Sequence, residues 1–150
     1  VGYGDDVTYV ENHVFIENGI KMLLRKRIDE GFKIVIVSGD ARGVDAASKI
    51  IAERNDWKHI EFKADWDSNG SAAGCIRNEQ MYEFVSNKPH YGALLIWDGE
   101  SPGTMNNFLQ AYDYNVPLRC FEYMQHRWLS KDEIWNVQER VATSRRWYNR

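Results

Sequence analysis

One pattern occurs twice in this chain and constrains its fold more than any other feature. A short apolar run ends in a glycine-containing loop, and a helix-like segment follows at once; the first copy covers residues 34–44 and the second covers residues 93–104. Strand-like and helix-like segments also alternate through most of the chain, which is typical of βαβ units on a parallel sheet. We therefore expect an α/β protein with a mostly parallel sheet, in which both glycine loops lie at the carboxyl edge.

Hydrophobic spacing and glycine positions predict the individual elements. The expected helices cover residues 10–30, 44–55, 72–85 and 104–114, and the expected strands cover residues 33–37, 59–63, 93–97 and 118–123. The strands at 33–37 and 93–97 are apolar on both faces, which predicts burial. Residues 64–70 are expected to form a loop. In the helix that follows, Ile76, Met81 and Phe84 are the expected core residues.

The length of 150 residues fits a single domain with one hydrophobic core. We expect this core within about residues 33–123, followed by a helical extension over residues 125–150. A capping box at Ser130 to Glu133 predicts the start of the C-terminal helix. Residues 1–6 resemble the end of a strand and the loop that follows it.

Charge and cysteine content limit the classes of partner. The net charge of −3 gives no indication of nucleic-acid binding. No apolar run resembles a membrane span or a signal peptide, so we expect no membrane partner. Cys75 and Cys120 lack metal-ligand spacing and are interpreted as reduced thiols of a cytoplasmic protein, with a single disulfide as the alternative. The four histidines are scattered, which predicts no metal site.

The first glycine loop offers a candidate anion site. Gly39 and Gly43 bracket a tight turn before a predicted helix, where backbone N–H groups can face a phosphate. Ser38 stands at the end of the strand, and Arg42 could meet a phosphate or stack on a base. Asp45 falls in the first helical turn and could bind a ribose hydroxyl. The structural alternative is that the glycines only permit the turn and that Asp45 only favours the helix dipole.

The second loop and the segment before it carry further candidates. Gly103 and Thr104 would face a phosphate at a helix N-terminus, although Thr104 could simply cap that helix. Trp66 lies in a loop rich in Asp and small residues and could stack on a base. Arg77 and Asn78 would lie about one turn into the next helix, facing the loop edge. The alternative for Arg77 is a surface ion pair with Glu79 or Glu83.

Four segments in this order resemble the SLOG superfamily, and most closely its small bacterial and phage branch that is similar to YspA. The segments are Ser-Gly-Asp-Ala-Arg-Gly-Val-Asp at 38–45, Ala-Asp-Trp-Asp at 64–67, Ala-Ala-Gly-Cys-Ile-Arg-Asn-Glu-Gln-Met at 72–81 and Ser-Pro-Gly-Thr at 101–104. The resemblance covers roughly residues 33–120. It implies a Rossmann-like three-layer fold, a nucleotide-derived ligand, a cytoplasmic location and assembly into homo-oligomers, in the host cytoplasm if the chain is phage-encoded.

The sequence departs from the related Lonely Guy phosphoribohydrolases at one decisive position. Those hydrolases carry a catalytic Glu after their Gly-Thr pair, and this chain has Asn107 there. An amide cannot act as a general base, so an enzyme of this kind would need Asp45, Asp65 or Asp67 in place of that Glu. Arg77 matches the catalytic Arg of that family and would be catalytic here only if the protein is an enzyme. At the N-terminus, Gly2-Tyr3-Gly4 stands where the family tends to have Gly-Ser-Arg, so a phosphate-contacting Arg is missing.

The residues and the resemblance together predict a protein that binds a nucleotide or nucleotide-derived signalling ligand at the C-terminal edge of the sheet. It would act as a sensor or a sequestering protein, in keeping with the role in phage–host conflict proposed for this branch. The alternatives are a nucleoside monophosphate phosphoribohydrolase and, because DNA-processing relatives bind single-stranded DNA, a single-stranded DNA-binding protein. No cofactor is expected. The predicted ligand-binding residues are Gly2, Gly4, Ser38, Gly39, Arg42, Gly43, Asp45, Asp65, Trp66, Arg77, Asn78, Gly103, Thr104 and Asn107.

Overall fold

The computed structural model describes the backbone of residues 6–144 and the side chains of residues 13–144. The chain divides into two compact units, with the boundary between Phe62 and Lys63. Each unit contains its own helices and its own hydrogen-bonded strands.

The first unit is built from two helices and two strands. They are α1 (Asp6–Asp29), β1 (Val35–Ser38), α2 (Val44–Arg54) and β2 (Lys58–Glu61). The two strands pair in parallel, with Val35 opposite Lys58 and Ser38 opposite Glu61. Helix α2 packs on both strands and α1 packs on α2. The loop after β1 therefore leads directly into a helix that covers the strands, as expected for a βαβ unit.

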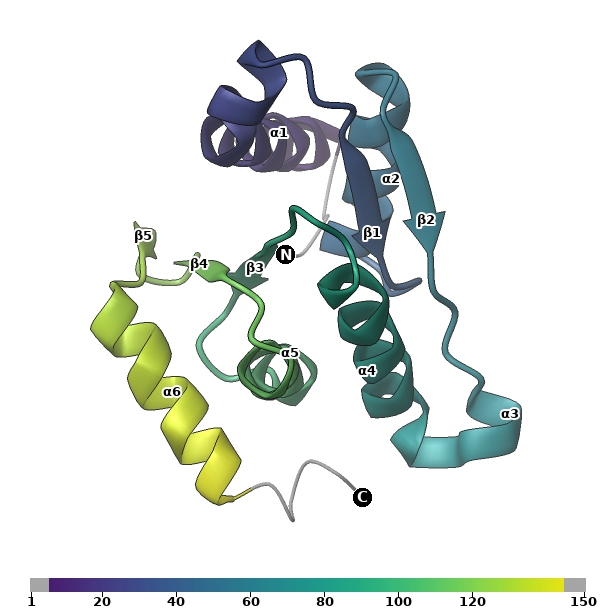
Figure 1. The fold of residues 1–150 in the computed structure, drawn as a ribbon, viewed down its shortest axis with the longest axis vertical. Helices are drawn as coiled ribbons and strands as arrows, with labels where there is room; N and C mark the ends of the chain where they lie inside the picture. Colours follow the sequence, from purple (N-terminus) through teal and green to yellow (C-terminus); the bar gives the residue numbers. More distant parts are fainter. Residues whose placement is uncertain (1–5, 145–150) are drawn as a thin grey trace. The chain divides into compact units, whose positions relative to one another are not determined.

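The second unit contains a three-stranded sheet and the remaining helices. In chain order its elements are α3 (Trp66–Asn69), the 3₁₀ turn η1 (Gly70–Ala72), α4 (Ala73–Ser86), β3 (Ala93–Trp97), α5 (Pro102–Asp113), β4 (Leu118–Glu122), β5 (Arg127–Trp128) and α6 (Lys131–Thr143). Strands β3 and β4 are parallel, and β5 is antiparallel to β4. Figure 1 shows α5 between α4 and α6, and α5 packs against both of them.

The mixed α/β class, the parallel strand pairs and the C-terminal helix are confirmed. The strands over 93–97 and 118–123 lie within a residue of their predicted bounds. Among residues 6–144, hydrogen bonds join the strands into two sets, β1–β2 and β3–β4–β5. A continuous sheet and a single 1–150 domain remain predictions.

Four local features differ from the predictions. The expected loop over 64–70 contains the short helix α3, and the antiparallel strand β5 was not predicted. Ile76 is 36% exposed rather than buried, because it lies on the opposite side of α4 from Asn78 and Tyr82. Val35 of β1 is 45% exposed, although the strand over 33–37 was predicted to be buried.

The core of the second unit forms around α5. Phe108 is fully buried on this helix and packs edge-to-face on Trp97 of β3, with 5.1 Å between ring centroids. The other buried members of this cluster are Leu95, Cys120, Leu129 and Ile134. A second cluster of Tyr82, Ala111 and Val116 joins α4 to the opposite end of α5. Helix α5 is therefore held from several sides.

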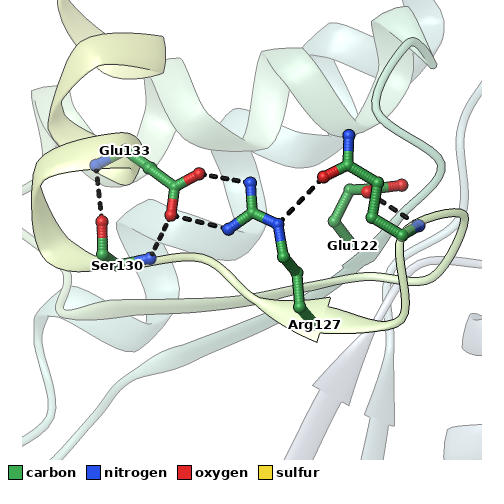
Figure 2. A network of polar contacts seen from close by, with 5 residues as sticks. Glu122, Arg127, Ser130 and Glu133 are labelled. Carbon is green, nitrogen blue, oxygen red and sulfur yellow. Dashed lines mark hydrogen bonds and ion pairs between the residues drawn. The ribbon is translucent and has the colours of Figure 1, made fainter.

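The start of α6 has the predicted capping box (Figure 2). The Ser130 hydroxyl accepts a hydrogen bond from the Glu133 N–H, and the Glu133 carboxylate accepts one from the Ser130 N–H. Arg127 of β5 donates to the same carboxylate at 2.8 Å through one terminal nitrogen, and its Nε donates to Gln125. These bonds, chiefly that from Arg127, lower the pKa of Glu133 to about 2.

We expect Phe108→Ala to lower the free energy of unfolding by about 3–5 kcal/mol, because it removes a fully buried aromatic side chain and leaves a cavity. Urea denaturation followed by far-UV circular dichroism measures this change. Met124→Ala is the matched control, since Met124 is 72% exposed and its loss should cost no more than about 0.5 kcal/mol. Equal effects of the two substitutions would contradict the core assignment.

The Glu133 carboxylate should make stability depend on pH in the acid range. Because its folded pKa is depressed from 4.5 to about 2, its contribution is present above pH 4.5 and is lost as the pH falls toward 2. Glu133→Gln retains an acceptor for the cap but removes the charge. We expect this variant to melt below the wild type at pH 7 and to converge with it near pH 2. If the difference in melting temperature between the two proteins stays constant across this pH range, the Glu133 charge does not contribute to the pH dependence of stability.

Candidate functional site

The predicted site residues fall into two groups, one in each unit. The first unit holds Ser38, Gly39, Arg42, Gly43 and Asp45. The second unit holds Asp65, Trp66, Arg77, Asn78, Gly103, Thr104 and Asn107. Gly2 and Gly4 lie outside the described residues.

A side-chain hydrogen bond holds the loop after β1 against the start of α2. The Asp45 carboxylate accepts from the Ala41 N–H at 3.1 Å, so this residue ties the loop to the first turn of α2. Gly43 is buried, and its φ of 85° explains the need for glycine by backbone conformation alone. Arg42 is exposed at the loop surface. Backbone conformation and the bond to Ala41 thus explain why Gly43 and Asp45 occupy these positions without any ligand. The phosphate contact of Arg42 stays a prediction.

Ser38 is held by a residue that sequence reasoning did not select. Its hydroxyl lies 2.8 Å from Nε2 of His59, which stands on the neighbouring strand β2, and 3.0 Å from the Gly39 carbonyl, to which it donates. Ser38 is buried, and burial lowers the pKa of His59, as does Lys49, while nearby carboxylates, first among them Glu61, oppose that shift. The neutral ring therefore fits this position.

The loop after β3 is also preorganised by its own residues. The Asp98 carboxylate accepts from the backbone N–H groups of Ser101 and Glu100, at 2.7 and 2.9 Å, and these bonds lower its pKa. Gly99 has a φ of 89°, and a Cβ there would lie 3.6 Å from the Glu122 carboxylate. This glycine is required by backbone conformation. The loop holds its shape before any ligand arrives.

Gly103 differs from Gly99 in a way that bears on ligand binding. It has no positive φ, and a Cβ built on it meets no atom within 4 Å, so nothing in the fold requires glycine there. It follows Pro102 in the first turn of α5, whose N-cap is Ser101 without a side-chain capping bond. The structure thus corrects the alternative that Thr104 caps this helix, because Thr104 lies inside the first turn.

Arg77 and Asn78 are joined to α5 by a chain of hydrogen bonds. Nε of Arg77 donates to the side-chain oxygen Oδ1 of Asn78 at 2.9 Å, and the side-chain nitrogen Nδ2 of Asn78 donates to Oδ1 of Asn106 at 3.0 Å. Both asparagines are buried. The expected partner Glu79 accepts a hydrogen bond from the Tyr114 hydroxyl. Two predicted site segments, the Arg-Asn pair and the first turns of α5, are therefore directly connected.

Trp66 lies on the surface of the same unit. The residue is 58% exposed, and a Cβ on Gly74 of α4 would be 3.6 Å from the edge of the indole. Asp65 has a structural role as the N-cap of α3, since its carboxylate accepts from the Ser68 N–H. The exposed indole is available for stacking, whereas the position of Asp65 is explained by the helix that it caps.

Asn107 makes a local contact within α5. Its amide donates to the Gly103 carbonyl oxygen at 3.0 Å, one turn earlier in the helix. This bond ties the Asn107 side chain to the helix backbone. The contact is consistent with a supporting role near the first turn and supplies no general base.

The second unit also has a surface hollow, which lies away from the predicted site residues. A surface hollow of about 630 Å³ is lined by residues at the far, C-terminal end of α5 and by Trp135 of α6, and it includes none of the predicted site residues. Within residues 13–144, no group of three His, Cys, Asp or Glu side chains is arranged to hold a metal ion. Among the described helices, none combines the length and the apolar character needed to cross a membrane.

Sequence reasoning missed Asn106 and His59. Asn106 stands directly before the predicted site residue Asn107, is 1% exposed and is bonded to Asn78. The available signal was its spacing of three residues from Leu109, which places both side chains on one side of a helix, because a buried amide needs a partner. His59 belongs to a short strand that is parallel to β1, and only the strand register brings it to Ser38.

None of the family models, curated proteins or solved structures with which the chain was compared matches it. The SLOG resemblance therefore stays a prediction from the sequence segments.

We expect the pKa of His59 to lie below 6.5, so that its neutral form favours the folded state. The corresponding stability is fully present above pH 6.5 and decreases as the pH falls through that value toward the lowered pKa. An NMR titration of the ring measures the pKa, and His59→Gln, which keeps a donor for Ser38, should flatten the pH dependence. A pKa at or above 6.5 would contradict burial as the dominant influence.

Proposed function

We propose that this chain binds a nucleotide or nucleotide-derived ligand and acts as a sensor or sequestering protein. The observation that carries the proposal is the hydrogen-bonded connection from Arg77 through Asn78 to Asn106, which joins a guanidinium to the N-terminal part of α5. Guanidinium groups and helix N-termini both favour phosphate. The proposal includes the SLOG membership, the Rossmann-like three-layer fold, the cytoplasmic location and the homo-oligomer that the sequence resemblance implies.

The surrounding residues support binding of a planar, phosphorylated molecule. Gly103 presents open space at the first turn of α5, which permits close approach of a ligand to the backbone. Because the Asp98 carboxylate already holds the loop in shape, the entropic cost of ordering this loop on ligand binding is lower. The exposed indole of Trp66 offers a surface on which a base can stack.

Binding without turnover is favoured over N-glycosidic hydrolysis. A phosphoribohydrolase needs a carboxylate at the sugar, and the matching position holds Asn107, whose amide is bonded to the Gly103 carbonyl. A role in binding single-stranded DNA has less support, because the net charge is −3 and such sites are electropositive.

The ligand class is tested with a panel of nucleoside monophosphates, cyclic dinucleotides and ADP-ribose derivatives. We expect at least one compound to raise the melting temperature and to be recovered intact after heat release. Chromatography distinguishes the alternatives, since free base in the eluate would show hydrolysis. No stabilisation by any compound would refute nucleotide binding, and preferential binding of an oligodeoxynucleotide would favour the DNA alternative.

Gly103→Ala separates ligand approach from folding. The added methyl meets no atom within 4 Å, and alanine reduces the freedom of the unfolded chain, so stability should stay unchanged or rise by up to about 1 kcal/mol. Affinity for the compound identified in the panel should fall about tenfold or more, because the Cβ would stand where a phosphate approaches the helix.

Met124→Ala, at the exposed turn after β4, is the control for unaltered binding. Calorimetric titration measures affinity, and thermal melting measures stability. Unchanged affinity in Gly103→Ala would exclude the first turn of α5 from the site. A loss of stability in the same variant would show that this glycine is needed by the fold instead.

A further inference from the structure

Two buried asparagines form an amide pair between α4 and α5. Asn78 is 4% exposed and Asn106 is 1% exposed, and the Asn78 amide nitrogen lies 3.0 Å from the Asn106 carbonyl oxygen. Burying amides is costly unless their hydrogen bonds are made, whereas two apolar side chains would pack there without this requirement. Packing alone therefore does not explain why both helices carry an amide at this contact.

The pair has a direction, and that direction leads to Arg77. The carbonyl oxygen of Asn78 accepts from Nε of Arg77 at 2.9 Å while its amide nitrogen donates to Asn106. An amide turned by 180° would present N–H groups to the guanidinium, which has no acceptor. The acceptor supplied by Asn106 thus selects the orientation of Asn78 that can hold Arg77.

The bond at Nε constrains the plane of the guanidinium. Rotation about the last side-chain torsions of Arg77 would break the 2.9 Å contact, so the terminal nitrogens take a direction set by Asn78. Asn106 lies three residues, about one helical turn, after Gly103. The Asn106 side chain therefore connects the Arg77 guanidinium, through Asn78, to a position one turn after Gly103 in α5.

We propose that Asn106 is a positioning residue, which acts through Asn78 to orient the Arg77 guanidinium for a phosphorylated ligand at the first turn of α5. This inference rests on the proposed function for its ligand, but the orientation of Arg77 is a property of the unliganded protein. Preorganisation of this kind lowers the entropic cost of ordering a long side chain on binding. Asn106 itself does not touch the ligand.

The first test needs no ligand. In the wild type, exchange of the Arg77 Nε proton with solvent, measured by NMR, should be slower by about tenfold or more than that of the exposed Arg140. The Arg77 signal is assigned by its loss in Arg77→Lys. Equal exchange at the two arginines would overturn the proposal, whatever the variants do.

Substitutions then test the role of Asn106. Asn106→Leu should abolish the protection of the Arg77 Nε proton, and Asn106→Asp, which keeps an acceptor for Asn78, should restore most of it. Gln138→Leu removes another buried amide of this unit, which donates to the Phe108 carbonyl, and should leave the protection unchanged. Equal loss in Asn106→Leu and Gln138→Leu would show a general loosening and would overturn the proposal.

Affinity for AMP and ADP-ribose provides the final test by a double-mutant cycle. Asn106→Leu and Arg77→Lys should each weaken binding, and the double variant should bind no more weakly than Arg77→Lys alone, since both changes remove one contact. Additive losses would overturn the positioning role. If the wild type binds neither probe and no compound of the panel, the proposed function fails, while the exchange measurements still decide whether Asn106 orients Arg77.

Discussion

The burial of helix α5 is the constraint on which the second unit depends. Phe108 and Leu109 are fully buried on it, and the helix packs against β3, α4 and α6. A helix enclosed in this way has little room for polar side chains, so each polar residue on it must find a defined partner. The side-chain oxygen of Asn106 accepts a hydrogen bond from Asn78, and the backbone carbonyl of Phe108 accepts one from the side chain of Gln138 in α6.

The same constraint links the core to the candidate site. Because α5 is held by its apolar residues, the position of its first turn is set by packing far from Gly103. The loop that precedes it is shaped by the Asp98 carboxylate, which satisfies two backbone N–H groups. A side chain that depends on α5, as Arg77 does through two amides, inherits this rigidity. Precise placement of a binding group therefore follows from ordinary core formation.

The predictable part of this protein is mainly local. Strand β3 and helix α2 are marked by apolar periodicity and by flanking glycines, and the capping box at Ser130 is legible from residue types alone. The errors arose where burial depended on neighbours. Ile76 has the hydrophobicity of a core residue but lies on the side of α4 away from Tyr82, and a helix of four residues at Trp66 is too short to give a periodic signal.

The sequence by itself predicted the longer helices, the strands of the parallel pairs and the candidate binding residues, because these predictions follow from spacing and residue type over a few neighbouring positions. Only the tertiary structure decided which glycines the backbone requires, which side chain holds Ser38, and how Arg77 is oriented. Gly99 and Gly103 look equivalent as letters, yet only Gly99 has a positive φ. Asn106 acquires its partner from a residue 28 positions away, and such a contact exists only once α4 and α5 have packed.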